Sequence, residues 1–186
     1  MKCIVLLLTV MLLLGGILAD TASNLSAARA AADKLGADLV KELRRALKKE
    51  GVTAAVAVCH ERAPAIAATI TRETGYTVGR TSLRVRNPQN APDAWEKKVL
   101  AEFADRHRLG EALKNMEYSE VVETKDGREF RYMKAIPTRK LCLQCHGTNV
   151  PPELAAILKE KYPQDKATGF AAGDLRGAFT IRKKLE

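Results

Sequence analysis

The sequence predicts an α+β protein with helices in its first half and an antiparallel sheet in its second half. Apolar residues recur at helical spacing through residues 24–74. Two strands, 116–124 and 128–136, then flank a Lys-Asp-Gly turn, which indicates a β-hairpin. A glycine-marked approach leads to a last strand at 178–184. Helices followed by an antiparallel sheet define the α+β class.

The chain begins with a segment typical of export. Lys2 is followed by an apolar run, 4–19, before the first acidic residue, Asp20. A bilayer span needs about 20 apolar residues, so this shorter run predicts a signal peptide, with an uncleaved anchor as the alternative. We expect an exported, periplasmic protein made of a signal peptide (1–19), an N-terminal helix (20–50) and one main domain (51–186).

The charge balance is basic, with 31 Lys and Arg against 22 Asp and Glu, or +9. Such a balance would suggest nucleic acid as the partner of a cytosolic protein. Export argues against nucleic acid and favours an acidic redox partner or a membrane surface, with a solvated basic surface as the simpler interpretation. We expect membrane contact only through the N-terminal segment, if it stays uncleaved.

The first helix is predicted over residues 24–50. Leucines recur every fourth residue along it, and Gly51 follows as a helix-ending glycine. Its other face is basic. We therefore expect a helix that packs on the domain or pairs with a second copy in a homodimer. Its leucines are Leu35, Leu39, Leu43 and Leu47.

A second helical stretch, 52–74, carries an apolar stripe with Cys59 at its centre. Successive members of the stripe are three or four residues apart, and at about 100° per residue they fall within an arc of about 80°. His60 lies about 100° round the helix and is expected at the edge or in solvent. Pro64 is expected to bend or restart the helix after Arg62. The stripe comprises Val52, Val56, Cys59, Ala63, Ile66 and Ile70.

Shorter elements complete the pattern. A strand is predicted at 76–85, and a helix opens at Pro92 and runs to about Arg108. Residues 137–152 are expected to form a loop, and residues 153–162 a helix.

That loop contains the motif Cys142-x-x-Cys145-His146. In c-type cytochromes the two thiols of this motif attach to haem and the histidine binds the iron. A thioredoxin-like disulfide would need a βαβ setting, which the region lacks. Zinc bound by both thiols, His146 and a fourth ligand such as Cys59 is the remaining alternative. The export signal agrees with haem, which is attached outside the cytoplasm.

Cys59 then remains as an odd thiol in an oxidising compartment. An inert buried cysteine is the commonest fate of this residue type. A buried thiol beside an iron with an open coordination position differs, because the metal stabilises the thiolate.

Three ordered blocks of sequence resemble an exported c-type haem family with a PAS-like domain. They are RTSLRVRNPQNAPDAWE (80–96), FRYMKAIPTRKLCLQCHG (130–147) and YPQDKATGFAAGDLRGAF (162–179). The resemblance covers about residues 35–186. It implies N-terminal helices packed on a PAS-like antiparallel sheet, with the haem segment in a loop. It also implies one covalent haem c and a helical cysteine as second axial ligand, in a context that reads CHERAPAIA (59–67) here.

With His146 and Cys59 on the iron, no coordination position is left for catalysis, so we expect no enzyme activity. The resemblance implies a redox or small-ligand sensor whose iron takes a diatomic gas after Cys59 is released, and which signals to a protein partner. A single-electron carrier between periplasmic redox partners is the alternative, and a haem-bearing structural module is a third. His60 would be the substitute ligand if its helix were rotated.

The remaining candidates have ordinary structural interpretations beside the functional one. Arg80, Arg84 and Arg86 would share one face of the predicted strand 76–85, either binding haem propionates or facing solvent. Tyr132 on the hairpin could reach the haem edge. Met116 and Met133 are more typical of a core than of iron ligation, and His107 lies among charges at a helix end.

Overall fold

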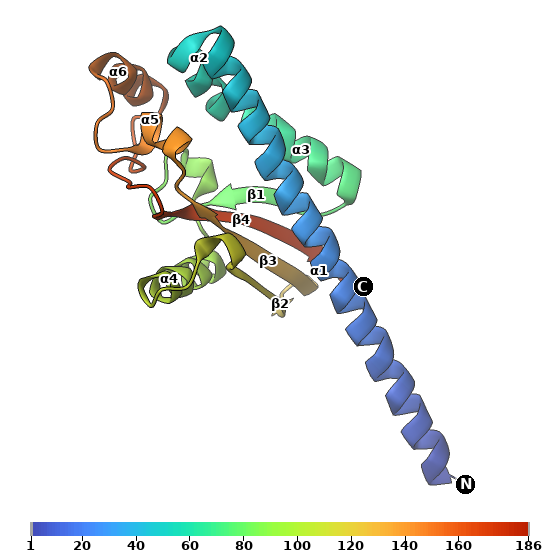
Figure 1. The fold of residues 1–186 in the computed structure, drawn as a ribbon. Coiled ribbons are helices and arrows are strands. Elements are labelled where there is room, and N and C mark those ends of the chain that lie inside the picture. The colour runs from blue at the N-terminus through green and yellow to red at the C-terminus, as the bar shows by residue number, and fades with distance from the viewer. Residues whose placement is uncertain (1, 186) are drawn as a thin grey trace.

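The computed structural model describes the backbone of residues 2–185 and the side chains of residues 20–185. Helices and a four-stranded antiparallel sheet form one α+β assembly, as the sequence predicts (Figure 1). The side chains of the predicted signal peptide, 1–19, lie outside the described residues. Among residues 20–185, whose side chains are described, no helix is long and apolar enough to cross a membrane.

Residues 2–74 are almost entirely helical. The first helix, α1, runs from Lys2 to Lys49, and Gly51 follows with a positive φ of 82°, which a glycine adopts without strain. The chain then reverses into α2 (Gly51–Ala57), a π-helical turn (Val58–Arg62) and α3 (Ala63–Thr74). Figure 1 shows α1 lying along α2 and α3 and extending beyond the rest of the fold.

The π-helical turn is placed where the sequence predicts a restart. Pro64 lies at the start of α3 and lacks the backbone N–H that a continuous helix would need. The backbone widens by one residue over Val58–Arg62, which contains Cys59. The predicted apolar stripe is confirmed, because Val56, Ala63 and Ile70 are buried and the other members half-buried.

The sheet has the strand order β1-β4-β3-β2, all antiparallel. Its strands are β1 (Thr77–Thr81), β2 (Glu117–Thr124), β3 (Gly127–Pro137) and β4 (Leu175–Lys184). The predicted hairpin is confirmed, and Gly127 has the positive φ, 105°, that its turn requires.

The predicted strand 76–85 is too long, because β1 covers only Thr77–Thr81 and ends four residues earlier than predicted. The Ser82 hydroxyl accepts a hydrogen bond from the Arg84 N–H (3.1 Å) and lies 2.8 Å from the Arg176 carbonyl, to which it can donate. These bonds turn the chain out of the sheet after Thr81. Arg84 and Arg86 therefore do not continue the face of Arg80.

Short helices flank the sheet. The α4 helix (Ala94–Arg108) begins with a capping box between Asp93 and Glu96. The motif region is more ordered than the predicted loop, since it forms a 3-10 turn (Lys140–Cys142) and a one-turn helix, α5 (Leu143–His146). The α6 helix (Pro152–Lys161) follows. Further 3-10 turns lie at Pro88–Asn90 and Leu113–Asn115.

Two layers cover the sheet. On one face, α1 and α3 bury Leu35 and Ile70 against Phe130, Tyr132 and Ile181. On the other face, α4 packs Leu100 and Phe103 with Met116 and Met133. A smaller cluster joins α2 to α6 through Val56, Leu154, Leu158 and Tyr162. The candidate site lies at the end of the sheet near α2, α5 and α6.

Candidate cofactor site

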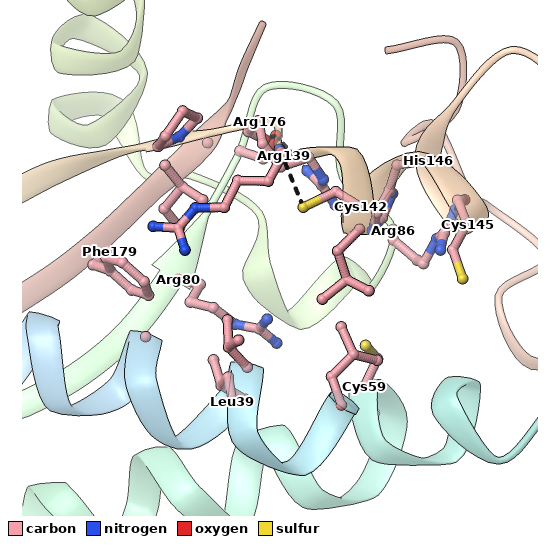
Figure 2. Close-up of a pocket in the computed structure, with 18 of the residues that line it drawn as sticks. Leu39, Cys59, Arg80, Arg86, Arg139, Cys142, Cys145, His146, Arg176 and Phe179 are labelled. Carbon is pink, nitrogen blue, oxygen red and sulfur yellow. Dashed lines mark hydrogen bonds between the residues drawn. The ribbon is translucent and has the colours of Figure 1, made fainter. Parts of the chain in front are cut away.

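A cavity of about 880 Å³ lies between α1, the end of the sheet and the Cys-x-x-Cys-His segment. Cys59, Cys142, Cys145 and His146 all line it, although Cys59 is far from the others in sequence (Figure 2). We call residues 139–147 the motif wall. The helical wall is the part of α1 from Gly36 to Leu47 together with Cys59.

The motif wall presents its two thiols from consecutive short helical turns. Cys142 ends the 3-10 turn, and its sulfur accepts a 3.4 Å hydrogen bond from the Arg139 N–H. Cys145 lies one turn later in α5. Burial raises the pKa of the Cys145 thiol, and the nearby Cys59 adds to that rise. The three cysteines are free thiols and half-buried.

His146 is held in one orientation and one tautomer. Its Nδ1 lies 2.6 Å from the Ala167 carbonyl oxygen, which can only accept, so Nδ1 carries the proton. Burial, reinforced by Arg176 and Arg86, lowers the pKa of His146 to about 2. The imidazole is therefore neutral at physiological pH, and its Nε2 has a free lone pair. This is the arrangement found in histidines that bind metals.

The carbonyl that holds His146 is itself held by a buried ion pair. Arg86 contacts Asp165 at 2.9 Å, and their side chains are only 8% and 11% exposed. Asp165 accepts a 2.7 Å bond from the Ala167 N–H, while Arg86 donates to the Cys145 carbonyl at 2.6 Å. Arg86 therefore ties the motif wall to the loop that orients His146. Sequence reasoning placed Arg86 on a strand face and did not detect this role.

Backbone bonds complete the attachment of the motif wall. The Phe170 N–H donates to the His146 carbonyl and the Gly169 N–H to the Gly147 carbonyl, each at 2.9 Å. The Phe170 ring also meets the imidazole edge-on, with centroids 6.3 Å apart. Residues 165–170 thus form a clamp along one side of the motif wall.

The helical wall is built differently, and its part beside Cys59 is apolar. Cys59 projects from the π-helical turn toward the cavity, opposite the motif wall (Figure 2). His60 is exposed, does not line the cavity, and packs its ring against Tyr162 at 5.3 Å. Leu39, Leu43 and Leu47 of α1 line the cavity beside Cys59. No hydrogen bond of the Cys59 thiol is recorded among the described residues.

Of the arginines predicted as haem contacts, some line the cavity and one does not. Arg80 lines the cavity, together with Arg86, Arg139 and Arg176. Burial and the charges of Arg86 and Arg80 lower the pKa of Arg176 to about 10. Arg84 does not line the cavity. It turns away after Ser82, donates to the Thr168 carbonyl, and stacks 4.1 Å above the Phe170 ring.

Tyr132 also lies away from the cavity, contrary to its prediction as a haem contact. Its position in β3 points it at α1, where it is fully buried, and its hydroxyl donates to Glu117 at 2.8 Å. Met116 and Met133 are fully buried beside α4, as expected of core residues. His107 lies at the end of α4 beside the Glu111 carbonyl, outside the cavity.

The donor set fits a haem with the attachment motif of c-type cytochromes. Two thiols and a neutral imidazole with a free Nε2 lie on one wall, and a third thiol lies on the opposite wall. Apolar side chains and arginines, groups suited to a porphyrin and its carboxylates, line the same space. Among the described residues, no three His, Cys, Asp or Glu side chains are close enough to share a metal ion.

Comparisons with known proteins agree with this architecture. A family described as Tll0287-like matches residues 19–183. A crystal structure of the cyanobacterial heme-protein Tll0287 has a similar fold, with a TM-score of 0.63. At 23% identity, the match covers 90% of this chain and 96% of that one. No curated protein matches.

Proposed function

We propose a function for this chain, which belongs to the Tll0287-like family: it carries one haem, attached covalently in the cavity. The observation that carries the proposal is the convergence of Cys59, Cys142, Cys145 and His146 on one cavity of about 880 Å³. The similar fold of a solved heme-protein supports it. In this proposal Cys142 and Cys145 form the thioethers.

His146 and Cys59 would be the two axial ligands. The Ala167 carbonyl fixes the His146 proton on Nδ1 and directs Nε2 away from it. Cys59 faces the motif wall from the π-helical turn, a backbone form that often occurs at functional sites. When bound, haem supplies an iron that exchanges one electron, and a thiolate ligand favours its ferric state. With both positions occupied, the protein is not an enzyme.

The function that follows is an exported redox or small-ligand sensor. The His146 side is tied by several polar contacts, whereas the Cys59 thiol has no recorded hydrogen bond among the described residues. Cys59 is therefore the ligand that can leave on reduction and open a position for a diatomic gas. A redox or signalling protein would read the change.

A single-electron carrier is the alternative, favoured by the exposed Lys41 and Arg44 beside the cavity, which suit an acidic redox partner. Stopped-flow reduction, followed by carbon monoxide addition, separates the two functions. A sensor changes ligation on reduction and then binds carbon monoxide. A carrier keeps both ligands and excludes the gas.

Spectroscopy of Cys59→Ala tests the proposed ligands. The protein is exported together with haem-attachment machinery, and ferric wild type and variant are compared by absorption and low-temperature EPR. We expect a thiolate-type low-spin signal in the wild type and its loss in the variant, with haem still covalently bound by mass spectrometry. Cys142→Ala/Cys145→Ala should lose the covalent bond.

His60→Ala is the matched control, because this residue is adjacent to Cys59 but exposed and outside the cavity. Its spectrum should equal that of the wild type. If Cys59→Ala leaves the spectrum unchanged, Cys59 is not an iron ligand and the electron-carrier function takes first place. Protein isolated without covalent haem from cells that load a control cytochrome would refute the whole proposal.

A further inference from the structure

We propose that the mouth of the cofactor cavity is a docking surface for an acidic protein, the partner that the proposed function requires. This inference rests on the proposed function for its biological meaning. The surface is formed by four exposed basic residues that line the cavity, and we call it the cationic rim. Its members are Lys41, Arg44, Lys114 and Arg139.

The cationic rim has members on both sides of the opening. Lys41 and Arg44 project from α1, in the helical wall. Arg139 begins the motif wall, and Lys114 lies in the 3-10 turn Leu113–Asn115 before β2. Like charges on both sides of a hollow add their fields over it, which attracts and orients a negatively charged group.

The rim is not neutralised by its surroundings. Among the described residues, no ion pair or side-chain hydrogen bond of its four members is recorded. The cavity lining holds one carboxylate, that of Asp33, and this is paired with Lys134. Exposed charges of one sign without partners are unfavourable in the free protein and become favourable against an acidic surface.

Bound haem would leave the rim charged. Arg80, Arg86 and Arg176 also line the cavity, and the two that are most enclosed, Arg86 and Arg176, lie beside His146. These enclosed guanidinium groups, and not the exposed rim, would hold the haem carboxylates. The rim charges therefore remain available to a partner.

The shape of the surface favours a protein over a lipid bilayer. The rim lies on both sides of the cavity mouth, so an acidic segment that protrudes from a protein can contact α1 and the motif wall together. A flat bilayer would reach only the outermost side chains. We therefore assign the rim to a protein with a convex acidic surface.

Binding of an acidic peptide tests this assignment. The haem-loaded protein is titrated into fluorescein-labelled poly-L-glutamate at low salt, and fluorescence anisotropy is measured. We expect Lys41→Glu/Lys114→Glu to weaken binding by about tenfold or more, since a focused field raises association by at least that factor. Binding by the wild type should decline as salt rises from about 0.01 M to 0.15 M.

Lys97→Glu/Lys98→Glu is the matched control. Both lysines are exposed on α4, outside the cavity, and the double change alters the net charge equally. It should keep most of the wild-type affinity. Equal loss in both double variants, or no peptide binding at all, would overturn the proposal. Binding to anionic phospholipid vesicles with none to the peptide would overturn it in favour of a membrane surface.

The test of the docking surface can be distinguished from the test of the proposed function. Absorption of the same samples reports whether haem is present, whereas anisotropy reports the rim. A protein without haem that still binds the peptide through Lys41 and Lys114 would refute the function and leave the docking surface standing.

Discussion

The two walls of the cavity hold His146 and Cys59 in different ways. On the motif wall, His146 is fixed by the Ala167 carbonyl, the Arg86 to Asp165 pair and the backbone of Phe170. On the helical wall, the surroundings of Cys59 are the leucines of α1 and a widened turn. Directional polar contacts determine the position of a group, whereas apolar packing determines mainly the volume around it.

If His146 and Cys59 are the two ligands, as proposed, this difference indicates which of them can respond to the state of the cofactor. Moving His146 would break hydrogen bonds in a buried place, where unsatisfied polar groups are costly. Moving Cys59 breaks none that the described residues record, and a π-helical turn can relax toward α-helix. The motif wall is thus built as the fixed side of the site, and the helical wall as the adjustable side.

The largest expected effect comes from breaking the fixed side with Arg86→Ala. It leaves Asp165 buried without its partner and removes the bonds to the Cys145 and Ala167 carbonyls. Loss of one member of a buried pair costs about 3–5 kcal/mol of unfolding free energy. Urea denaturation of the haem-loaded protein measures this loss.

Arg84→Ala is the control, because Arg84 contacts the same loop but is exposed and does not reach the motif wall. It should cost well under half as much. Arg86→Ala/Asp165→Ala should recover part of the loss, since no lone charge remains buried. A loss for Arg86→Ala no greater than that of Arg84→Ala would contradict the fixed-wall description.

A smaller effect is expected on the adjustable side from Gly36→Val. A Cβ at this position of α1 would lie 3.0 Å from the Phe179 Cζ atom, so a branched side chain pushes the helix from the sheet. Overpacking of this kind costs about 2 kcal/mol. Urea denaturation should show this loss, while EPR of the ferric protein should show unchanged His146 ligation.

Gly36→Ala separates packing from helix propensity. Alanine raises helix stability by about 0.5–1 kcal/mol over glycine, which offsets much of its milder contact with Phe179. We expect its unfolding free energy within about 1 kcal/mol of the wild type. A loss as large for alanine as for valine would show that this part of α1 cannot move.

The smallest effect concerns the pH dependence of α1 docking. Hydrogen bonds from Arg29 and then Tyr132 lower the pKa of Glu117, which joins α1 to β2. Because the folded pKa lies below the unfolded value of about 4.5, the stabilisation is complete above that pH and is lost as pH falls through the folded pKa.

Urea unfolding at about pH 7 and pH 3, compared by the urea concentration at the midpoint, measures the contribution of Glu117 to stability. The wild type should lose slightly more stability on acidification than Glu117→Gln, which has no carboxylate to protonate. An equal loss in both proteins would exclude Glu117 as a source of the pH dependence.

Local patterns were sufficient for much of the fold. The helical stripe around Cys59, the restart near Pro64 and the hairpin at Gly127 each depend on neighbours in sequence, and the structure confirms all three. The Cys142-x-x-Cys145-His146 motif likewise identifies one wall of the cavity from local sequence alone.

Long-range contacts account for what sequence could not predict. Strand β1 ends at Thr81 because Ser82 bonds with Arg176, ninety-four positions away. The same turn separates Arg84 from Arg86 and leaves only the latter at the cavity. The role of Asp165 and Ala167 beside His146 also follows from packing of distant loops. Nothing in the sequence indicates that Arg86 and Asp165 are buried together as an ion pair.

The length of α1 has a mechanical consequence. Its forty-eight residues form one rod of about 72 Å, at 1.5 Å per residue. Arg29 attaches the rod to Glu117 partway along, and Leu47 lies about 27 Å from that pivot on the cavity side. In a chain that keeps residues 1–19, Lys2 lies about 40 Å away on the other side. A rigid lever with these arms converts each ångström of displacement at the cavity into about 1.5 Å at Lys2. Cleavage after Ala19 would remove most of this outer arm.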